Sequence, residues 1–216
     1  MKTGILWDLD GTLLDTLEDL ADAVNHALSR FGYPRRTIEE VRRFVGNGAA
    51  RLLALAVPEG ADPEPVLACF REYYDVHCRV KTKPYDGIPE ALAYLGAKYP
   101  MAIVSNKPDS AVKTLCADYF PGIYALGERP GCPRKPAPDM VRRAMAEIGV
   151  ERCVYVGDSE VDVLTAQNAG VPCLSVLWGF RDRADIAPLG TGGFCENTAD
   201  LAGKIEEMIW QMNFMP

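Results

Sequence analysis

The stretch GILWDLDGTLLDT, residues 4–16, begins as an apolar strand, continues with Asp8 and Asp10 on either side of a leucine, and then breaks at Gly11. An Asp-Gly pair is common in turns, and Asp15 or Thr16 is a suitable residue to cap a following helix. A turn is therefore one explanation of the segment. Whether the carboxylates do more depends on which other side chains the fold brings to the end of this strand.

Short apolar runs rich in β-branched residues predict the strands of a sheet. They lie at residues 5–8, 101–105, 123–126, 153–157 and 173–177, and helical patterns follow the first four. Near-continuous apolar runs are typical of parallel strands that are buried on both faces. The C-terminal segment has its apolar residues on one helical face, which we expect to pack on the sheet: Leu201, Ile205, Met208, Ile209 and Met212. The sequence thus predicts an α/β fold with a Rossmann-like parallel sheet.

The interval between the first two runs is much longer than one crossover helix requires. It contains apolar residues at helical spacing that begin at Leu17, include Phe31 and stop at Gly32, and a second such pattern over residues 66–77. We therefore expect an inserted, all-helical cap at residues 15–83. The catalytic core is expected to comprise residues 1–14 and 84–216.

The composition excludes several classes of protein. The chain has 216 residues, 48% hydrophobic and 25% charged, with a formal net charge of -7. This acidic balance, without a basic stripe, argues against nucleic acid or an anionic membrane as the partner. Neither a signal peptide nor a membrane-spanning run is expected. The oligomeric state is left open.

Cysteine usage indicates the compartment. The chain has 7 cysteines, an odd number, and none forms a C-x-x-C pair. Most lie among apolar neighbours, so we interpret them as reduced core residues and not as a disulfide or zinc framework. These features favour the cytoplasm.

Polar motifs recur at the ends of the predicted strands or in their loops. They are Asp8–Thr12, Ser105–Lys107, Lys135 and the segment Gly157–Asp162. Each motif alone has an ordinary explanation as a turn, a helix cap or a surface lysine. Ligands of open parallel sheets bind at the carboxyl ends of the strands, so together the motifs predict one shared crevice.

The residue types in these motifs suit phosphate chemistry. Asp8, Asp158 and Asp162 offer hard oxygen ligands of the kind that Mg²⁺ prefers. Ser105 and Lys135 offer a hydroxyl donor and a cation for phosphate oxygens. Clustered aspartates repel one another unless a cation lies among them, so a metal would keep Asp8 ionised as a nucleophile.

These motifs resemble the signature of the haloacid dehalogenase-like hydrolase superfamily: D-x-D-G-T, then Ser or Thr, then Lys, then G-D-x-x-x-D. The resemblance covers essentially the whole chain, with the helical insert at the position of the family's cap. Four further segments are similar to the phosphoglycolate phosphatase-like branch: residues 45–49, 84–87, 105–107 and 178–179.

The resemblance implies a role for each motif residue. Asp8 would attack phosphorus to form an aspartyl-phosphate, while Asp10 would protonate the leaving oxygen and later activate water. Mg²⁺ would be bound by the side chains of Asp8 and Asp158 and the backbone carbonyl of Asp10, with Asp162 as a further ligand or as support for the ligands. Phosphate binding is implied for a further set: Thr12, Ser105, Asn106 and Lys135.

Asn47, between Gly46 and Gly48, interrupts a helical pattern in the cap. Two glycines around a polar amide suit a bend that points backbone toward a ligand, so Asn47 is a candidate substrate contact; a plain interhelix turn is the alternative.

The function predicted from the sequence is a Mg²⁺-dependent phosphatase for a small phosphorylated metabolite, with phosphoglycolate as the best candidate. A pyrophosphatase or nucleotidase of the same superfamily is an alternative. A phosphomutase of the β-phosphoglucomutase kind would share Asp8 and Asp10. Intact acid–base and metal motifs disfavour a non-catalytic binding module.

Overall fold

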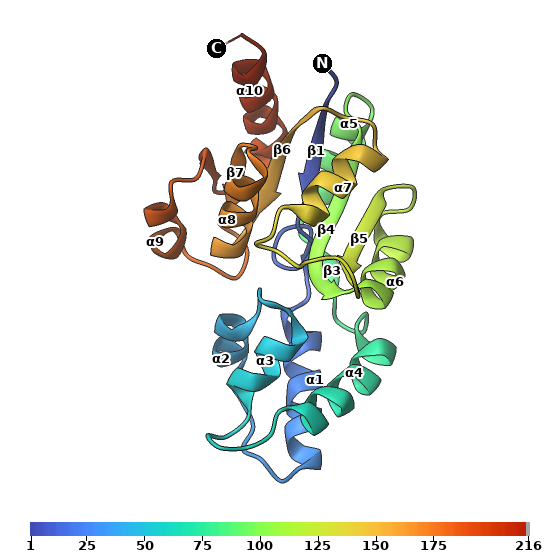
Figure 1. Ribbon diagram of the computed structural model, residues 1–216, viewed down its shortest axis with the longest axis vertical. Helices are drawn as coiled ribbons and strands as arrows, with labels where there is room; N and C mark the ends of the chain where they lie inside the picture. Colours follow the sequence, from blue (N-terminus) through green and yellow to red (C-terminus); the bar gives the residue numbers. More distant parts are fainter. Residues whose placement is uncertain (215–216) are drawn as a thin grey trace.

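A six-stranded parallel sheet forms the centre of the protein in a computed structural model that describes residues 1–214 (Figure 1). Its strand order is β5-β4-β1-β6-β7-β8. The strands are β1 (Thr3–Trp7), β4 (Met101–Pro108), β5 (Tyr124–Glu128), β6 (Arg152–Gly157), β7 (Cys173–Val176) and β8 (Gly193–Cys195). The parallel α/β sheet expected from the apolar runs is confirmed, and all five predicted strands are present.

The central position of β1 explains its apolar sequence. Leu6 lies opposite Ala102 of β4 and opposite Tyr155 of β6, so β1 is paired on both edges. Alternate residues of the strand enter different hydrophobic clusters, with Ile5 and Trp7 on one face of the sheet and Leu6 on the other. Both faces are therefore buried, as continuous apolar strands require.

Helices cover both faces of this sheet. The cluster that contains Leu6 also includes residues of α7 (Asp139–Glu147) and α8 (Glu160–Ala169). The opposite cluster includes residues of α5 (Ile88–Gly96), α6 (Asp109–Tyr119) and α10 (Leu201–Phe214). The expected packing of the C-terminal helix on the sheet is thus confirmed. The short helix α9 (Arg183–Ile186) completes the fold beside α8.

The interval between β1 and β4 folds into four helices that lie beyond the carboxyl ends of the strands (Figure 1). These are α1 (Leu17–Arg30), α2 (Ile38–Phe44), α3 (Gly48–Ala56) and α4 (Glu64–His77). An antiparallel pair of two-residue strands, β2 (Leu14–Asp15) and β3 (Lys83–Pro84), joins them to the core. The position of this pair matches the expected junctions, while the division into a core and a cap at 15–83 stays a prediction. Residues 215 and 216 of the expected core lie outside the described residues.

Two details differ from expectation. The first cap helix ends at Arg30, so Phe31 lies outside it and is 41% exposed. The chain reverses there because Gly32 adopts a φ of 69°, which favours glycine, and the Tyr33 amide donates to the Leu28 carbonyl. In addition β1 ends at Trp7, which leaves Asp8 just beyond the sheet.

Among the described residues, no helix is both long and apolar enough to cross a bilayer.

Candidate active site

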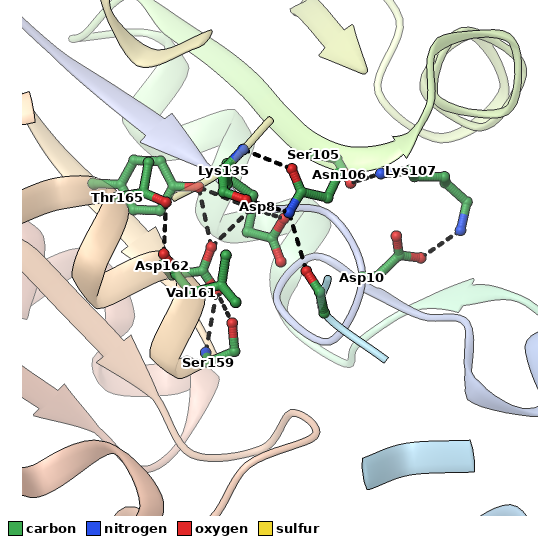
Figure 2. Close-up of polar contacts among 12 residues, drawn as sticks. Asp8, Asp10, Ser105, Asn106, Lys107, Lys135, Ser159, Val161, Asp162 and Thr165 are labelled. Carbon is green, nitrogen blue, oxygen red and sulfur yellow. Dashed lines mark hydrogen bonds and ion pairs between the residues drawn. The ribbon is translucent and has the colours of Figure 1, made fainter. Parts of the chain in front are cut away.

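The predicted motifs meet at the carboxyl edge of the sheet. Figure 2 shows the motif side chains that take part in the polar contacts described below: Asp8, Asp10, Ser105, Asn106, Lys107, Lys135 and Asp162. Asp8 follows β1, Ser105–Lys107 lie at the end of β4, and Asp158 follows β6. Lys135 comes from the loop between β5 and α7, and Asp162 lies in the first turn of α8. The topology therefore places these residues together at the strand ends, where we expected a shared crevice.

Lys135 connects two of the carboxylates. Its Nζ lies 2.6 Å from Asp8 Oδ1 and 2.8 Å from Asp162 Oδ1. The Tyr155 hydroxyl lies 3.1 Å from Lys135 Nζ and 3.1 Å from Asp162 Oδ1. The side chain of Lys135 is only 3% exposed, so its charge is neutralised by these carboxylates and not by water.

Asp162 is held by the start of its own helix. Its Oδ2 accepts from the Ser159 amide at 3.1 Å and from the Ser159 hydroxyl at 2.6 Å, and its Oδ1 faces Lys135. Both carboxylate oxygens thus have protein donors. This arrangement fixes Asp162 rigidly and positions Lys135 against Asp8.

Asp158 occupies a space that glycines make available. A Cβ atom on Gly11 would lie 2.3 Å from Asp158 Oδ2, and one on Gly179 would lie 2.4 Å from the same oxygen. Gly11 also has a φ of 84°, a conformation that favours glycine. The Phe180 amide donates to Asp158 Oδ2 at 2.6 Å. The glycine of the Asp-Gly pair is therefore needed to pack the first motif against the last.

The three carboxylates suit a divalent cation. Asp8, Asp158 and Asp162 each bring one oxygen to within 4.8 Å of the others, and all three residues are buried. Burial, and then repulsion from Asp162, raise the pKa of Asp8 well above its usual range and that of Asp158 to about 7. A cluster of hard oxygen donors whose charges repel one another fits Mg²⁺, which would offset this repulsion.

Asp10 has a different environment from Asp8. Its Oδ1 accepts from the Thr16 hydroxyl at 2.6 Å and lies 2.7 Å from Lys107 Nζ. Burial alone would lower the pKa of Lys107, but Asp10 and Tyr74 together raise it, so that the net pKa lies above the usual range. The two aspartates of the opening segment thus have separate cationic partners, Lys135 and Lys107.

The expected phosphate-binding residues have different surroundings. Ser105 lines the cavity described below, and its Oγ accepts from the Lys107 amide at 3.1 Å. The Asn106 amide group donates to the Lys135 carbonyl at 2.9 Å and to the Gly46 carbonyl at 3.2 Å, and its Oδ1 accepts from the Lys135 amide at 2.8 Å. Asn106 therefore positions the Lys135 loop. Its phosphate contact stays a prediction.

Thr12 is fully buried, and among the described residues its hydroxyl has no hydrogen-bond partner and does not line the cavity. Its backbone carbonyl accepts from the Trp178 indole at 3.1 Å. A role of the Thr12 side chain in phosphate binding stays a prediction.

A cavity lies between the helical insert with α1–α4, for which we keep the name cap, and the sheet with its loops, for which we keep the name core. From the core it is lined by Asp8, Asp10, Ser105, Asn106, Lys107, Pro108, Lys135, Asp158, Ser159, Phe180 and Arg181. From the cap it is lined by Leu20, Val45, Gly46, Gly48, Ala49, Leu52, Phe70 and Tyr74. The cavity is thus polar on the side of the carboxylates and mostly apolar on the side of the cap.

The bend predicted around Asn47 is present, because α2 ends at Phe44 and α3 begins at Gly48. Gly46 and Gly48 have φ values of 122° and 80° and line the cavity. Asn47 itself is exposed and is not among the described residues that line the cavity. The glycines bring backbone to the site, while contact of the Asn47 side chain with substrate stays a prediction.

Comparison with known proteins identifies the family. A model of the haloacid dehalogenase-like hydrolases matches residues 5–176. The chain belongs to this family. The matched region of this hydrolase includes the four sequence motifs and all four cap helices.

Two relatives of this haloacid dehalogenase-like hydrolase are named phosphoglycolate phosphatase. The chain is 34% identical over 212 residues to phosphoglycolate phosphatase 1 of Pseudomonas aeruginosa, covering 91% of this chain and 77% of the relative. It is 33% identical to phosphoglycolate phosphatase of Rhodobacter capsulatus, covering 97% and 100%. A crystal structure of a candidate phosphoglycolate phosphatase from Lactobacillus delbrueckii subsp. bulgaricus has a TM-score of 0.88 at 35% identity, covering 95% and 99%.

Several residues of the site were not predicted from the sequence. In the sequence, Thr16 appears only as a possible helix cap and Lys107 only as part of a motif. Tyr74 lies within the helical pattern at residues 66–77, and Phe180 and Arg181 belong to none of the motifs. The segment that contains Arg181 directly follows Trp178-Gly179, which resembles the family, so its position was the available signal.

Proposed function

We propose that this haloacid dehalogenase-like hydrolase is a Mg²⁺-dependent phosphatase that cleaves a small phosphate monoester through an aspartyl-phosphate. Phosphoglycolate is the best candidate substrate. The observation that carries the proposal is the pairing of two aspartates with two separate buried lysines, Asp8 with Lys135 and Asp10 with Lys107, at one cavity. The names of the relatives support the choice of substrate.

Asp8 is the nucleophile in this proposal. One of its oxygens faces Lys135, and the residue lines the cavity, so a carboxylate oxygen is available to attack phosphorus. The attack forms the Asp8–phosphorus bond and breaks the bond between phosphorus and the ester oxygen. Lys135 and the Ser105 hydroxyl are placed to bind the phosphoryl oxygens during this transfer.

Asp10 is the proton donor. It is two residues from the nucleophile and lines the same cavity, while Thr16 and Lys107 hold one of its oxygens. Asp10 gives its proton to the leaving alcohol and then accepts a proton from the water that attacks the phosphorus of the phosphoenzyme. This second attack releases inorganic phosphate and restores Asp8.

Asp8, Asp158 and the Asp10 carbonyl would hold Mg²⁺, with Asp162 as a further ligand or as support for the ligands. When bound, Mg²⁺ supplies positive charge that neutralises the carboxylates and the transferred phosphoryl group. The surroundings of Asp158 suit this role, because Gly11 and Gly179 allow two loops to approach its carboxylate closely.

The cytoplasm is the proposed compartment. All seven cysteines are free thiols, in keeping with reducing conditions. The substrate is then a soluble metabolite, with neither nucleic acid nor membrane as a partner; the oligomeric state is left open.

A substrate panel tests the proposal. The purified protein is assayed with phosphoglycolate, p-nitrophenyl phosphate, pyrophosphate, a nucleoside monophosphate and a sugar phosphate, with Mg²⁺ and with excess chelator. We expect hydrolysis of monoesters only with Mg²⁺, and its loss in Asp158→Ala. Asp22→Asn, a matched change of an exposed cap carboxylate that pairs with Lys81, should leave the activity unchanged. Full activity in excess chelator, or transfer of the phosphoryl group to a sugar faster than to water, would contradict the proposal.

A further inference from the structure

The hydroxyl of Tyr74 is a buried donor without an acceptor. Tyr74 lies in the cap helix α4, is 2% exposed and lines the cavity. Among the described residues, its hydroxyl oxygen has no hydrogen-bond partner. Burial raises the pKa of Tyr74 above its usual range, so the phenol keeps its proton. Buried polar groups normally have partners, so an unpaired donor at a cavity wall indicates a ligand group that accepts from it.

A second donor lies over the ring of Tyr74. Lys107 Nζ is 4.7 Å from the centroid of the Tyr74 ring, and the Lys107 side chain is 3% exposed. The ammonium has three N–H donors, and its contact with Asp10 Oδ1 uses one of them. Lys107 is in the core and Tyr74 in the cap, so the pair exists only where the two parts of the chain meet.

The other cations that line the cavity are committed elsewhere. Lys135 is shared by Asp8 and Asp162 and is aligned for the phosphoryl group. Arg181 pairs with Glu160 and donates to backbone carbonyls of the cap. Within the described part of the chain, Lys107 has a single carboxylate partner, Asp10, and so keeps capacity for a further acceptor.

The position of this pair follows from the direction of the reaction. Asp10 must lie next to the leaving oxygen, and Lys107 binds Asp10, so the atoms that follow the leaving oxygen lie toward Lys107 and Tyr74. The surrounding cap wall is apolar, with Leu20, Leu52 and Phe70. At this apolar wall, Lys107 and Tyr74 are donors for a compact leaving group that has its own negative charge.

We propose that Lys107 and Tyr74 form the subsite that binds a carboxylate on the leaving group, so that these two residues select phosphoglycolate over alkyl phosphates that have no carboxylate. This inference rests on the proposed phosphatase function and names the residues that choose its substrate. Both residues are specificity-determining residues: Tyr74 donates from the cap and Lys107 from the core. Carboxylate binding then also links the cap to the core over the substrate.

A matched pair of esters and a matched pair of variants test the subsite. Phosphoglycolate and ethyl phosphate have similar leaving groups, but only the former has a carboxylate. We compare the ratio of their kcat/KM values in the intact protein, in Tyr74→Phe and in Tyr73→Phe. Tyr73 is the neighbouring residue in α4, and its ring stacks on His26 and His77.

The intact protein should prefer phosphoglycolate, and Tyr74→Phe should lower the ratio on the order of tenfold, as expected for a lost hydrogen bond to a charged group. Tyr73→Phe should leave the ratio within about twofold, since its hydroxyl is outside the cavity lining. An unchanged ratio in a folded Tyr74→Phe would overturn the subsite. Should Tyr74→Phe not fold, Lys107→Gln must lower the same ratio.

Failure of the subsite differs from failure of the proposed function. If the intact protein hydrolyses both esters equally well with Mg²⁺, the subsite is wrong and the phosphatase function stands. If it hydrolyses neither these esters nor p-nitrophenyl phosphate, the proposed function itself is wrong.

Discussion

Replacement of Arg181 by methionine should loosen the contact between the cap and the core. The Arg181 guanidinium donates to the Arg42 carbonyl at 2.9 Å, to the Val45 carbonyl at 2.7 Å and, at the surface, to the Arg43 carbonyl at 3.3 Å. These carbonyls lie at the C-terminal end of α2, where carbonyl groups lack partners within the helix. Arg181, a residue of the core, therefore supplies hydrogen bonds to the carbonyls at the C-terminal end of α2.

The magnitude follows from the two shorter hydrogen bonds. A hydrogen bond from a charged donor contributes about 1.5 to 3 kcal/mol, so two of them at the lower value contribute about 3 kcal/mol. Since about 1.4 kcal/mol corresponds to a tenfold change, the balance between closed and open cap should shift on the order of 100-fold. The measured loss of kcat/KM should lie between about tenfold and 100-fold. It is smaller than the shift in the equilibrium if the closed form is strongly favoured at the start, because part of the protein then stays closed.

The assay is the kcat/KM for phosphoglycolate with saturating Mg²⁺, together with the radius of gyration from small-angle X-ray scattering. Arg183→Met is the control, because Arg183 pairs with Glu196 at 2.7 Å and lies over the Phe194 ring, all within the core. Arg181→Met should expand the protein and lower kcat/KM, and the control should do neither. If the two variants behave alike in both measurements, the hydrogen bonds to α2 do not hold the cap.

Three further predictions concern packing and specificity. Gly179→Ala should weaken Mg²⁺ binding at least tenfold in titrations, because its Cβ would lie 2.4 Å from Asp158 Oδ2; wild-type affinity would show that the loop yields. Asn47→Ala should change the ranking of substrates more than the rate of phosphoenzyme hydrolysis, and an unchanged ranking would favour the plain interhelix turn. Leu28→Ala, in the buried face of α1, should lower the free energy of unfolding by about 2 to 5 kcal/mol in urea titrations; a loss below about 1 kcal/mol would contradict tight packing there.

The sheet could be predicted from the sequence because burial on both faces leaves a direct mark on it. Strands such as β1 and β6 have no exposed face, so their apolar runs are continuous. β8 could not be predicted in this way because it has only three residues, GFC, after a glycine-rich segment. A strand of that length has too few side chains to show a pattern.

The meeting of the motif residues could be predicted because they follow strand ends, and parallel strands end at the same edge. The contacts between cap and core could not. Lys107 Nζ lies 4.7 Å from the centroid of the Tyr74 ring although the two residues are far apart in the sequence, and this contact depends on how the cap packs on the core. Its spacing within a helical pattern makes Tyr74 look like an ordinary core residue. The burial of Tyr74 agrees with that interpretation, but its unpaired hydroxyl does not.

Separate roles for Asp8 and Asp10 make a related prediction. Asp10→Asn should leave Mg²⁺ binding largely intact and slow both proton-dependent steps. An ester with a good leaving group, such as p-nitrophenyl phosphate, needs little protonation, so its phosphorylation rate should fall less than that of an alkyl phosphate. Equal loss with both esters would show that Asp10 is not the acid.

Rapid-quench detection of the phosphoenzyme tests the central claim most directly. The protein is mixed with substrate and Mg²⁺, quenched in acid, and assayed for protein-bound phosphate that hydroxylamine releases, as an acyl phosphate requires. The intact protein should form this species within the first turnover, and Asp8→Asn should form none, because the amide is a poor nucleophile. An acid-stable, hydroxylamine-sensitive phosphoenzyme in Asp8→Asn would contradict the assignment of Asp8 as the nucleophile.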